Sequence, residues 1–467
     1  MIAIRSWAIL NLMARTDLPV DSSRVRGKRF GFWAVAFAFA TGMAFTTVPT
    51  PLWSLYAQRD GLSSLTVTIV FAVYAVAVAL SLFLVGHLSD LHGRRRVLMP
   101  ALALEVLAGV VFIAWPSLPG LLLARLLSGL GVGAVTATAT AWLSDLGGAG
   151  SRRAQIVATG ANLGGLGLGG LISGALAQWA GHVLLVPFLV FIAALVLAWM
   201  GLLAAPETRA RRRPMPRYRP QHVSVQPRSR ARFIAAALGA AIAFSVFGLL
   251  TSLAPSFLAG TLHEPSHVLA GAVAFAVFAT AALAQTLTAS RAAPQLLAAA
   301  IPALLAGLGL LTVAVWLPSP SFAVFLAGDL VVGAGSGLMF KGAIATVSEV
   351  SAEEHRAEAL AGLFLAAYVG LAGPVIGLGA LTQVASTRVS LLVFAGMLAL
   401  GILAAAPALL GRRAHHSSSQ PATPPDDRSN HVPDTVENSS ARRDRPRDHP
   451  PRVRGHDARA DRRTRRR

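Results

Sequence analysis

Long apolar stretches separated by short polar loops fill the chain from residue 30 to residue 410. About 20 mainly apolar residues suffice to cross a bilayer as a helix, and a helix is expected because lipid offers the backbone no hydrogen-bond partners. The pattern predicts an all-α membrane protein with twelve transmembrane helices. The predicted spans are 30–53, 65–86, 97–115, 119–143, 153–179, 184–205, 233–258, 267–289, 293–316, 321–344, 357–383 and 388–410.

Composition agrees with a chain that is solvated by lipid. Of the 467 residues, 54% are hydrophobic and only 13% are charged, whereas soluble domains carry about 25% charged residues. The absence of cysteine excludes disulfides, thiolate metal sites and cysteine nucleophiles. No Gly-x-x-x-x-Gly-Lys-Ser/Thr segment is present to cradle a nucleotide, and the histidines are scattered. We therefore expect no enzymatic activity, no cofactor and no metal.

Positive charge is concentrated in loops and in the tail. Segments 206–232 and 412–467 carry net charges of +8 and +7 out of a total of +20. With the amino terminus placed in the cytoplasm, the inside loops hold 16 basic residues and the outside loops hold only Arg59 and Arg388. This asymmetry favours a multi-pass protein of the plasma (inner) membrane with both termini in the cytoplasm, and it explains the charge without nucleic acid binding.

The last six predicted spans repeat features of the first six. A shift of 204 residues superposes Gly129, Gly131 and Gly133 on Gly333, Gly335 and Gly337, and Arg125 on Asp329. Chance alignment of glycine-rich helices is the alternative. Internal symmetry of this kind is typical of duplicated transporters, in which the substrate site lies at the repeat interface near the midplane. The repeat therefore predicts two pseudo-symmetric six-helix bundles.

Five parts follow from these patterns. They are a cytoplasmic amino-terminal segment at 1–29, a six-helix bundle at 30–205, a basic cytoplasmic linker at 206–232, a second six-helix bundle at 233–411 and a tail at 412–467. The tail is rich in Arg and Pro and poor in large apolar residues, which predicts disorder. We expect a solvated tail without a specific partner; contact of its last arginines with anionic lipid is the alternative.

The loop after the second span, Gly86-His-Leu-Ser-Asp-Leu-His-Gly-Arg-Arg-Arg96, is the most specific motif. Gly86 allows close helix approach, and Gly93 permits a tight turn. Asp90 can cap a helix or pair with a nearby arginine. Arg94 and Arg95 hold the loop on the inner side.

This loop resembles the signature of the major facilitator superfamily, Gly-x-Leu-Ala/Ser-Asp-Arg-x-Gly-Arg-Arg/Lys, and departs from it at Leu91. The resemblance extends over roughly residues 30–410. It implies a secondary transporter of small molecules by alternating access, which we expect to work as a monomer in the lipid bilayer. It also implies that the loop is a cytoplasmic gate, in which Asp90 docks on a helix of the second half and stabilises the outward-facing state.

Three charged side chains fall inside predicted spans: Glu105, Arg125 and Asp329. A charge at a helix centre costs roughly 2.5–3.5 kcal/mol on insertion scales, and such residues tend to be functional. Arg125 and Gly129 match an Arg-x-x-x-Gly pattern that the family links to coupling or substrate handling. The family arrangement suggests that Arg125 and Asp329 both face the central cavity, as possible partners. Glu105 and Asp329 are candidates for proton exchange, and a static role for each remains the alternative.

The fifth and eleventh spans are rich in glycine. Gly165, Gly169 and Gly170 partly match the family's antiporter motif, Gly-Pro-x-x-Gly-Gly, although close helix packing would account for them equally well. Gly373 and Pro374 predict a kink that is either static or used in gating. Candidate polar groups of the cavity are Asn162, Gln285, Tyr74 and Tyr368.

The sequence therefore predicts a secondary transporter for proton-coupled efflux of a small, largely apolar compound. No carboxylate lies in the first span, where many drug–proton antiporters of the family carry one. Two alternatives stay open. One is proton-coupled uptake of a nutrient such as a sugar or an organic acid. The other is a non-transporting membrane sensor or scaffold.

Overall fold

The computed structural model describes residues 22–86, 88–148, 150–209, 229–264, 266–352 and 355–411. The predicted tail at 412–467, most of the linker at 206–232 and most of the segment 1–29 lie outside these residues. Every regular element within the described ranges is helical. Twelve stretches of the described residues are long and apolar enough to cross a membrane, which confirms the predicted all-α fold with twelve spans.

The first half contains six spans. Its elements are α2 (Ser22–Thr47), η1 (Thr50–Leu52), α3 (Trp53–Asp60), α4 (Ser64–Val85), α5 (Leu88–His92), α6 (Arg94–Ala114), α7 (Leu118–Gly147), α8 (Arg152–Thr159), η2 (Gly160–Gly164), α9 (Gly165–Trp179) and α10 (Val186–Leu203). The first span comprises α2, η1 and α3, and it is interrupted where Pro49 and Pro51 remove backbone donors. The fifth span comprises α8, η2 and α9.

The second half repeats this plan. Its elements are α11 (Arg230–Ser252), α12 (Ala254–Gly260), α13 (His267–Leu287), α14 (Ala293–Trp316), α15 (Phe322–Val350), α16 (Arg356–Leu381) and α17 (Thr387–Leu410). Pro255 follows the break between α11 and α12, much as two prolines mark the break in the first span. The two opening spans of the halves are thus interrupted at corresponding places.

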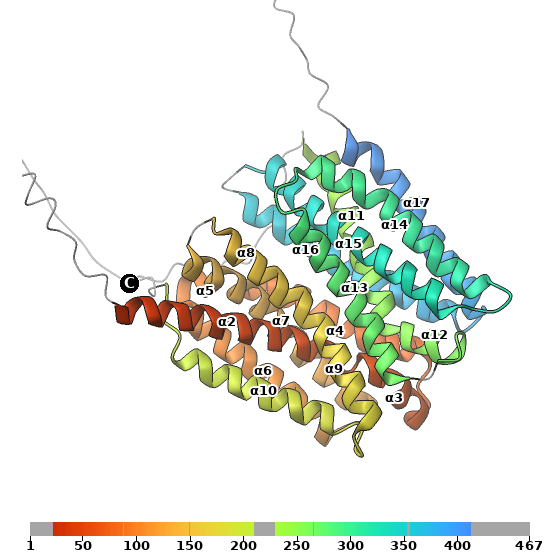
Figure 1. Cartoon of the computed structure of the whole chain (residues 1–467), viewed down its shortest axis with the longest axis horizontal. Helices are drawn as coiled ribbons and strands as arrows, with labels where there is room; N and C mark the ends of the chain where they lie inside the picture. The colour runs from red at the N-terminus through yellow and green to blue at the C-terminus, as the bar shows by residue number, and fades with distance from the viewer. Residues whose placement is uncertain are drawn as a thin grey trace, which may run out of the picture. The chain divides into compact units, whose positions relative to one another are not determined.

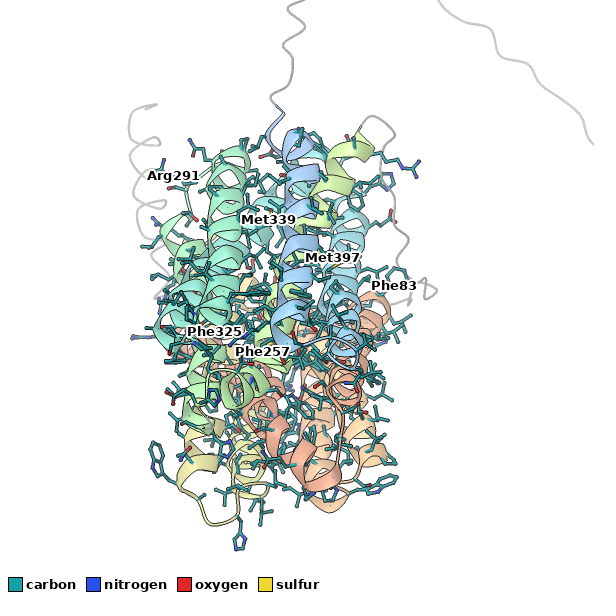
Figure 2. All side chains as sticks on the ribbon, turned by 90° about the vertical axis from the view of Figure 1, so that its right-hand side faces the viewer. Phe83, Phe257, Arg291, Phe325, Met339 and Met397 are labelled. Atoms are coloured by element: carbon teal, nitrogen blue, oxygen red, sulfur yellow. The ribbon has the colours of Figure 1, made fainter. Side chains whose placement is uncertain are left out.

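The end of the molecule that carries Gly86–Arg96 is called the motif end here, and the other is called the opposite end. Serines begin several helices at the opposite end because their hydroxyl oxygen accepts a hydrogen bond from a free backbone N–H of the first turn. These caps are Ser63, Ser266, Ser321 and Ser386. In Figure 2, Arg291 lies at the motif end of the second half, and Phe257 and Phe325 lie toward the opposite end.

Corresponding glycines make corresponding contacts in the two halves. Gly129 of α7 packs against the carbonyl of Tyr74 in α4, and Gly333 of α15 packs against the carbonyl of Val277 in α13. The pairs one turn further along are Gly133 with Val78 and Gly337 with Ala281. Small residues let helix backbones approach closely where lipid supplies no hydrophobic driving force. The predicted repeat is therefore present in the packing of the helices.

The two halves meet through two pairs of helices. Figure 1 shows the first half, red to yellow, beside the second half, green to blue. The fifth span contacts the eighth, through α9 and α13, and the second contacts the eleventh, through α4 and α16. These four helices make the most extensive contacts between the halves, and the space between the halves is the place to look for a site.

Candidate functional site

A cavity of about 90 Å³ lies between the two halves. Its first-half lining comes from α2, η1, α4, α7, η2 and α9, and its second-half lining comes from α11, α13, α15 and α16. Among the described residues that line it, none carries a formal charge. The cavity therefore has the position that the repeat predicted, at the interface between the bundles.

The first-half wall of the cavity carries most of the polar groups. Its polar side chains are Thr46, Thr47, Thr50, Tyr74, Thr136 and Asn162. Thr46 and Thr47 donate their hydroxyl hydrogens to backbone carbonyls, Thr46 to Met43 at 2.8 Å and Thr47 to Leu166 at 2.6 Å. Within the described part of the chain, the side chain of Asn162 forms no hydrogen bond. Asn162 therefore offers a free donor and acceptor to a ligand.

The second-half wall is mainly aromatic. Its aromatic side chains are Phe244, Phe247, Phe278, Phe340, Phe364 and Tyr368. Phe247 and Phe278 are stacked with ring centroids 5.0 Å apart. Phe244 packs edge-on against Tyr368 at 5.3 Å and tilted against Phe340 at 4.9 Å. The rings form one continuous cluster, and the hydroxyls on this wall are those of Tyr368 and of Thr251, which donates to the carbonyl of Phe247 at 2.6 Å.

Contacts between the halves close the cavity toward the opposite end. Gly174 of α9 lies against the backbone of His267 at the start of α13. The His267 N–H also donates to the side-chain oxygen of Gln178 at 3.1 Å. On the other side, Gly379 near the end of α16 lies against Thr68 of α4. All these residues lie nearer to the opposite end of their helices than the cavity does.

The glycines of the fifth span pack against two neighbouring helices, α2 and α13. Gly165 and Gly169 face backbone carbonyls of α2, whereas Gly170 faces Ala274 of α13 in the other half. A side chain at Gly169 would overlap both the Ala44 carbonyl and a threonine hydroxyl. The fifth span is therefore held between its own half and the second half: Gly165 and Gly169 allow close packing on α2, and Gly170 allows close packing between the bundles.

A π-helical segment, Gly160–Gly164, interrupts the fifth span beside the cavity. Such segments widen the helix by one residue and are frequent at functional sites. Asn162 and Leu163 belong to this segment, and both line the cavity. This segment carries the free amide of Asn162, a predicted cavity residue, in the wall of the cavity. The π-helical segment itself was not predicted from the sequence.

Arg125 is buried, with 1% of its surface exposed, and it does not line the cavity. Its Nη1 donates to the carbonyl of Thr46 at 2.8 Å. Its guanidinium lies 5.0–5.7 Å from the ring centroids of Trp53, Phe71 and Tyr74. Arg125 therefore binds the carbonyl at the end of α2 and is surrounded by ring faces, which attract a cation.

The suggested partnership of Arg125 with Asp329 is not present in this structure. Both oxygens of Asp329 are buried and have no hydrogen-bond partner among the described residues, and the same is true of Nε and Nη2 of Arg125. Each residue lies one turn before the glycine that packs on its own half's second span, Gly129 or Gly333. The two charges therefore face different helices, and neither lines the cavity.

Glu105 of α6 is completely buried. Its Oε2 accepts a hydrogen bond from the Ser128 hydroxyl of α7 at 3.0 Å, and its Oε1 has no partner among the described residues. Asp329 and Glu105 are thus buried carboxyl groups with free oxygen atoms in the two halves. Groups of this kind inside a membrane are costly and tend to carry ions or protons.

The motif loop is held together by a charge cluster within the first half. Gly93 adopts a positive φ of 105°, which glycine tolerates. Arg94, of which 4% of the side chain is exposed, pairs with Asp90 at 2.8 Å and with Asp145 of α7 at 3.0 Å. Its Nη1 also donates to Ser89 at 2.7 Å. Asp90 therefore uses the nearby arginine in this conformation rather than the second half.

Glu207, just after the sixth span, is a member of this cluster that sequence reasoning missed. Its carboxylate accepts hydrogen bonds from the backbone N–H groups of Arg94 at 2.9 Å and Arg95 at 3.0 Å. These N–H groups are the free donors at the start of α6, where negative charge is favoured. Arg95 in addition donates to the carbonyl of Leu203 at 2.9 Å. The start of the linker is thereby tied to the motif loop.

The remaining predicted residues are placed as follows. Of the polar candidates for the cavity, Asn162, Tyr74 and Tyr368 line it and Gln285 does not. Helix α16 continues through Pro374, and a side chain at Gly373 would meet nothing within 4 Å. The free space beside this proline leaves room for bending, and the gating role of Gly373 and Pro374 stays a prediction.

Comparisons with known proteins agree with this architecture. The profile of the Major Facilitator Superfamily matches residues 32–327. The chain is 36% identical over 116 residues to "Putative multidrug resistance protein MdtD" of Escherichia coli O6:K15:H31, a match that covers 25% of this chain and 23% of that relative. The protein of the same name from Escherichia fergusonii is 35% identical over 116 residues. The match thus spans about a quarter of each of these relatives.

Solved transporter structures have the same fold. The nucleoside transporter NupG (D323A mutant) superposes with a TM-score of 0.63 at 12% identity, over 81% of this chain and 99% of that chain. The human organic anion transporter MFSD10 (TETRAN) gives 0.58 at 17% identity, over 81% and 99%. A bacterial homologue of the human lysosomal transporter Spinster, in an inward-facing and unoccupied conformation, gives 0.59 at 16% identity, over 82% and 98%.

Proposed function

Because the chain belongs to the Major Facilitator Superfamily, a family of secondary transporters rather than enzymes, we propose that it exports a small, uncharged, largely apolar compound in exchange for protons. The observation that carries this proposal is the cavity between the halves, which is aromatic on one side and polar but uncharged on the other. Alternating access requires that such a midplane site be exposed to each side in turn.

The chemistry of the cavity walls limits the substrate. A charged compound would lose its hydration and find no counter-ion on the described lining, and a buried unpaired charge is strongly disfavoured. A flat aromatic compound can instead stack on the phenylalanine cluster. The free amide of Asn162 and the hydroxyl of Tyr368 are suited to orient it, since a few polar groups in an apolar site fix orientation.

The size of the cavity supports a site that changes during transport. At about 90 Å³ it is smaller than the roughly 300–1,000 Å³ of pockets that enclose drug-sized ligands. A compound with more than a few ring atoms therefore requires the two walls to separate. The helix pairs that join the halves pack on glycines, which permit two rigid bundles to move relative to each other.

Asp329 is our candidate for the proton-binding group. Its two unpaired oxygens lie in the tenth span, one turn before the glycine contact with α13. Glu105 is the second candidate, because only one of its oxygens is hydrogen-bonded. Arg125, which binds the end of α2, would keep the broken first span in place while the halves move.

Export as the direction of transport is inferred from the loop charges and from the contacts between the halves. The loop charges favour a cytoplasmic motif end, and the contacts of Gly174, Gln178 and Gly379 with the other half lie toward the opposite end. A site reached from the cytoplasm is what an exporter needs to collect its substrate. The name of the relatives that match part of the chain, a multidrug resistance protein, is in keeping with export.

A binding screen tests the substrate class. The purified protein would be melted in the presence of uncharged aromatic compounds, sugars and organic acids, because a ligand that binds only the folded state raises its stability. We expect stabilisation by the aromatic compounds. Stabilisation by sugars or organic acids alone would contradict the proposal and favour nutrient uptake.

A matched pair of variants in α16 locates the binding. Tyr368→Phe removes one hydroxyl and is expected to raise the dissociation constant of the ligand about fivefold, which is the equivalent of one neutral hydrogen bond. Leu365→Ala on the exposed face of the same helix, where Leu365 is 42% exposed, should leave binding unchanged. Equal effects of the two changes would place the ligand elsewhere.

A further inference from the structure

A second pocket, of about 250 Å³, lies at the motif end of the first half. It is formed where α2, α7 and α8 meet, away from the central cavity. The residues that line it are Lys28, Arg29, Phe32, Leu146, Gly147 and Arg153. Three of the six are cations and none is an acid, so the pocket is a concentrated positive site with an apolar floor.

The guanidinium of Arg153 is held in place by aromatic rings. Its central carbon lies 5.4 Å from the ring centroid of Phe32 and 5.5 Å from that of Trp33. Within the described ranges, the side chains of Lys28, Arg29 and Arg153 form no ion pair. The ring contacts fix the orientation of the guanidinium but leave its hydrogen-bond donors free for an anion.

Two described acids of the first half at this end, Asp145 and Glu207, already have other partners. Asp145 pairs with Arg94 at 3.0 Å and with Arg209 at 3.4 Å, and Glu207 accepts backbone hydrogen bonds at the start of α6. The positive charge of the pocket is therefore not balanced by these neighbours. A bound anion would neutralise the positive charge of the pocket.

An exposed aromatic face of α2 leads from the pocket along the membrane. Phe30, Trp33 and Phe37 are 53%, 49% and 44% exposed. Their spacing of three and four residues places them on one side of the helix, over about 10 Å at 1.5 Å per residue. Large apolar side chains exposed on a membrane-spanning helix are expected to face lipid chains, and Trp33, on this exposed face, also contacts Arg153.

The pocket is not a consequence of the repeated fold. With the shift of 204 residues, Phe32, Trp33 and Arg153 correspond to Ala236, Ala237 and Ala357 in the second half. The cation and its two rings are therefore absent from the sequence of the other bundle. The scaffold of the second half is built without this feature, so packing of the repeated fold does not require it.

We propose that this pocket binds the phosphate-bearing headgroup of an anionic phospholipid, with an acyl chain along the face formed by Phe30, Trp33 and Phe37. Arg153 presents a planar fork that suits phosphate oxygens, and Lys28 and Arg29 supply further charge. Basic pockets between membrane helices bind anionic headgroups in this way. A free phosphate would use the cations but not the lipid-facing rings. This role is separate from the transport function proposed above.

Native mass spectrometry of the purified full-length protein tests the proposal. Dioleoyl phosphatidylglycerol and dioleoyl phosphatidylcholine would be titrated separately into neutral detergent, and the bound lipids counted. We expect the wild type to retain phosphatidylglycerol in preference to phosphatidylcholine. Arg153→Gln should weaken phosphatidylglycerol binding about fivefold, and the triple variant that adds Lys28→Ala and Arg29→Ala on the order of a hundredfold.

The matched control is Arg291→Gln, which removes an exposed arginine at the same end of the second half (Figure 2). It should bind phosphatidylglycerol like the wild type. Each variant must melt like the wild type in phosphatidylcholine; if the triple variant does not, the comparison of Arg153→Gln with Arg291→Gln decides. Equal loss in both single variants, no preference for phosphatidylglycerol, or its displacement by an equal concentration of inorganic phosphate would overturn the proposal.

Discussion

Helices α7 and α15 occupy corresponding places in the two halves, yet they differ in their buried charge. Both pack on the second span of their half through a pair of glycines one turn apart. One turn before the first of these glycines, α7 carries Arg125 and α15 carries Asp329. Arg125 has a carbonyl and three rings as partners, whereas Asp329 has none among the described residues.

The difference teaches that the repeat determines the scaffold but not the chemistry of each half. The walls of the cavity differ in the same sense, since threonines and Asn162 line the first half and phenylalanines line the second. We interpret the first half as the part that is held by hydrogen bonds and cation–π contacts. The second half then carries the stacking surface and the free carboxyl group.

The largest effect is expected at the unpaired acid. Asp329→Asn keeps the shape of the side chain but removes its ability to gain and lose a proton. Substrate-driven proton movement should fall to background in reconstituted vesicles, while exchange of labelled for unlabelled substrate continues. Full proton movement in this variant would contradict the proton-binding role of Asp329, and with it the functional difference between α7 and α15.

The next largest effect is expected at Arg125, the residue of the first half that corresponds to Asp329. Arg125→Met should lower the free energy of unfolding by about 2 kcal/mol, because desolvated cation–π contacts with Trp53, Phe71 and Tyr74 are lost. Exchange should slow because the Thr46 carbonyl loses its donor. Chemical denaturation in detergent measures the stability. If Arg125→Met abolished only proton movement, as we expect for Asp329→Asn, the assignment of structural and coupling roles would be wrong.

The glycine contacts test what the halves share. Gly129→Ala and Gly333→Ala each place a methyl group against a neighbouring backbone carbonyl. Both should destabilise the protein by a similar amount, about 1–3 kcal/mol, as overpacking does. Gly373→Ala, where a side chain meets nothing within 4 Å, is the matched control. Thermal melting of the three variants would show whether the two halves are equally sensitive.

The smallest effects are expected from single substitutions that compare the aromatic wall of the cavity with the threonine wall. Phe247→Ala should weaken binding of an aromatic ligand about tenfold, since about 1.4 kcal/mol of stacking and burial is lost. Thr136→Val removes a hydroxyl whose only hydrogen bond among the described residues is a 3.5 Å bond to the sulfur of Met43, and should change binding about twofold or less. Calorimetric titration measures both, and the opposite ranking would mean that the threonine wall dominates recognition.

Much of the fold could be predicted because its signals are local. Each span is a run of apolar residues, and the helices of the structure begin and end within a few residues of most predicted limits. The glycine spacing that predicted the repeat reappears as matched helix contacts. The motif loop was recognisable because its glycine, acid and arginines follow one another in sequence.

The site itself was harder to predict. In a membrane protein, phenylalanines that face lipid and those that face the cavity have the same apolar neighbours, so Phe247 and Phe340 were not singled out. The role of Glu207 depends on a backbone turn that brings the linker to α6. The partners of Arg125 are a carbonyl and ring faces, and a search of the sequence for an opposite charge pointed instead to Asp329.

The most direct test of proton-coupled export uses wild-type protein in inside-out vesicles with an acidic interior and a trapped pH dye. A compound that stabilises the purified protein would be added outside. We expect the interior to lose acidity only while that compound accumulates inside, and both changes to stop when the pH gradient is dissipated beforehand. Accumulation that is unaffected by the gradient, or binding without any accumulation, would contradict the account.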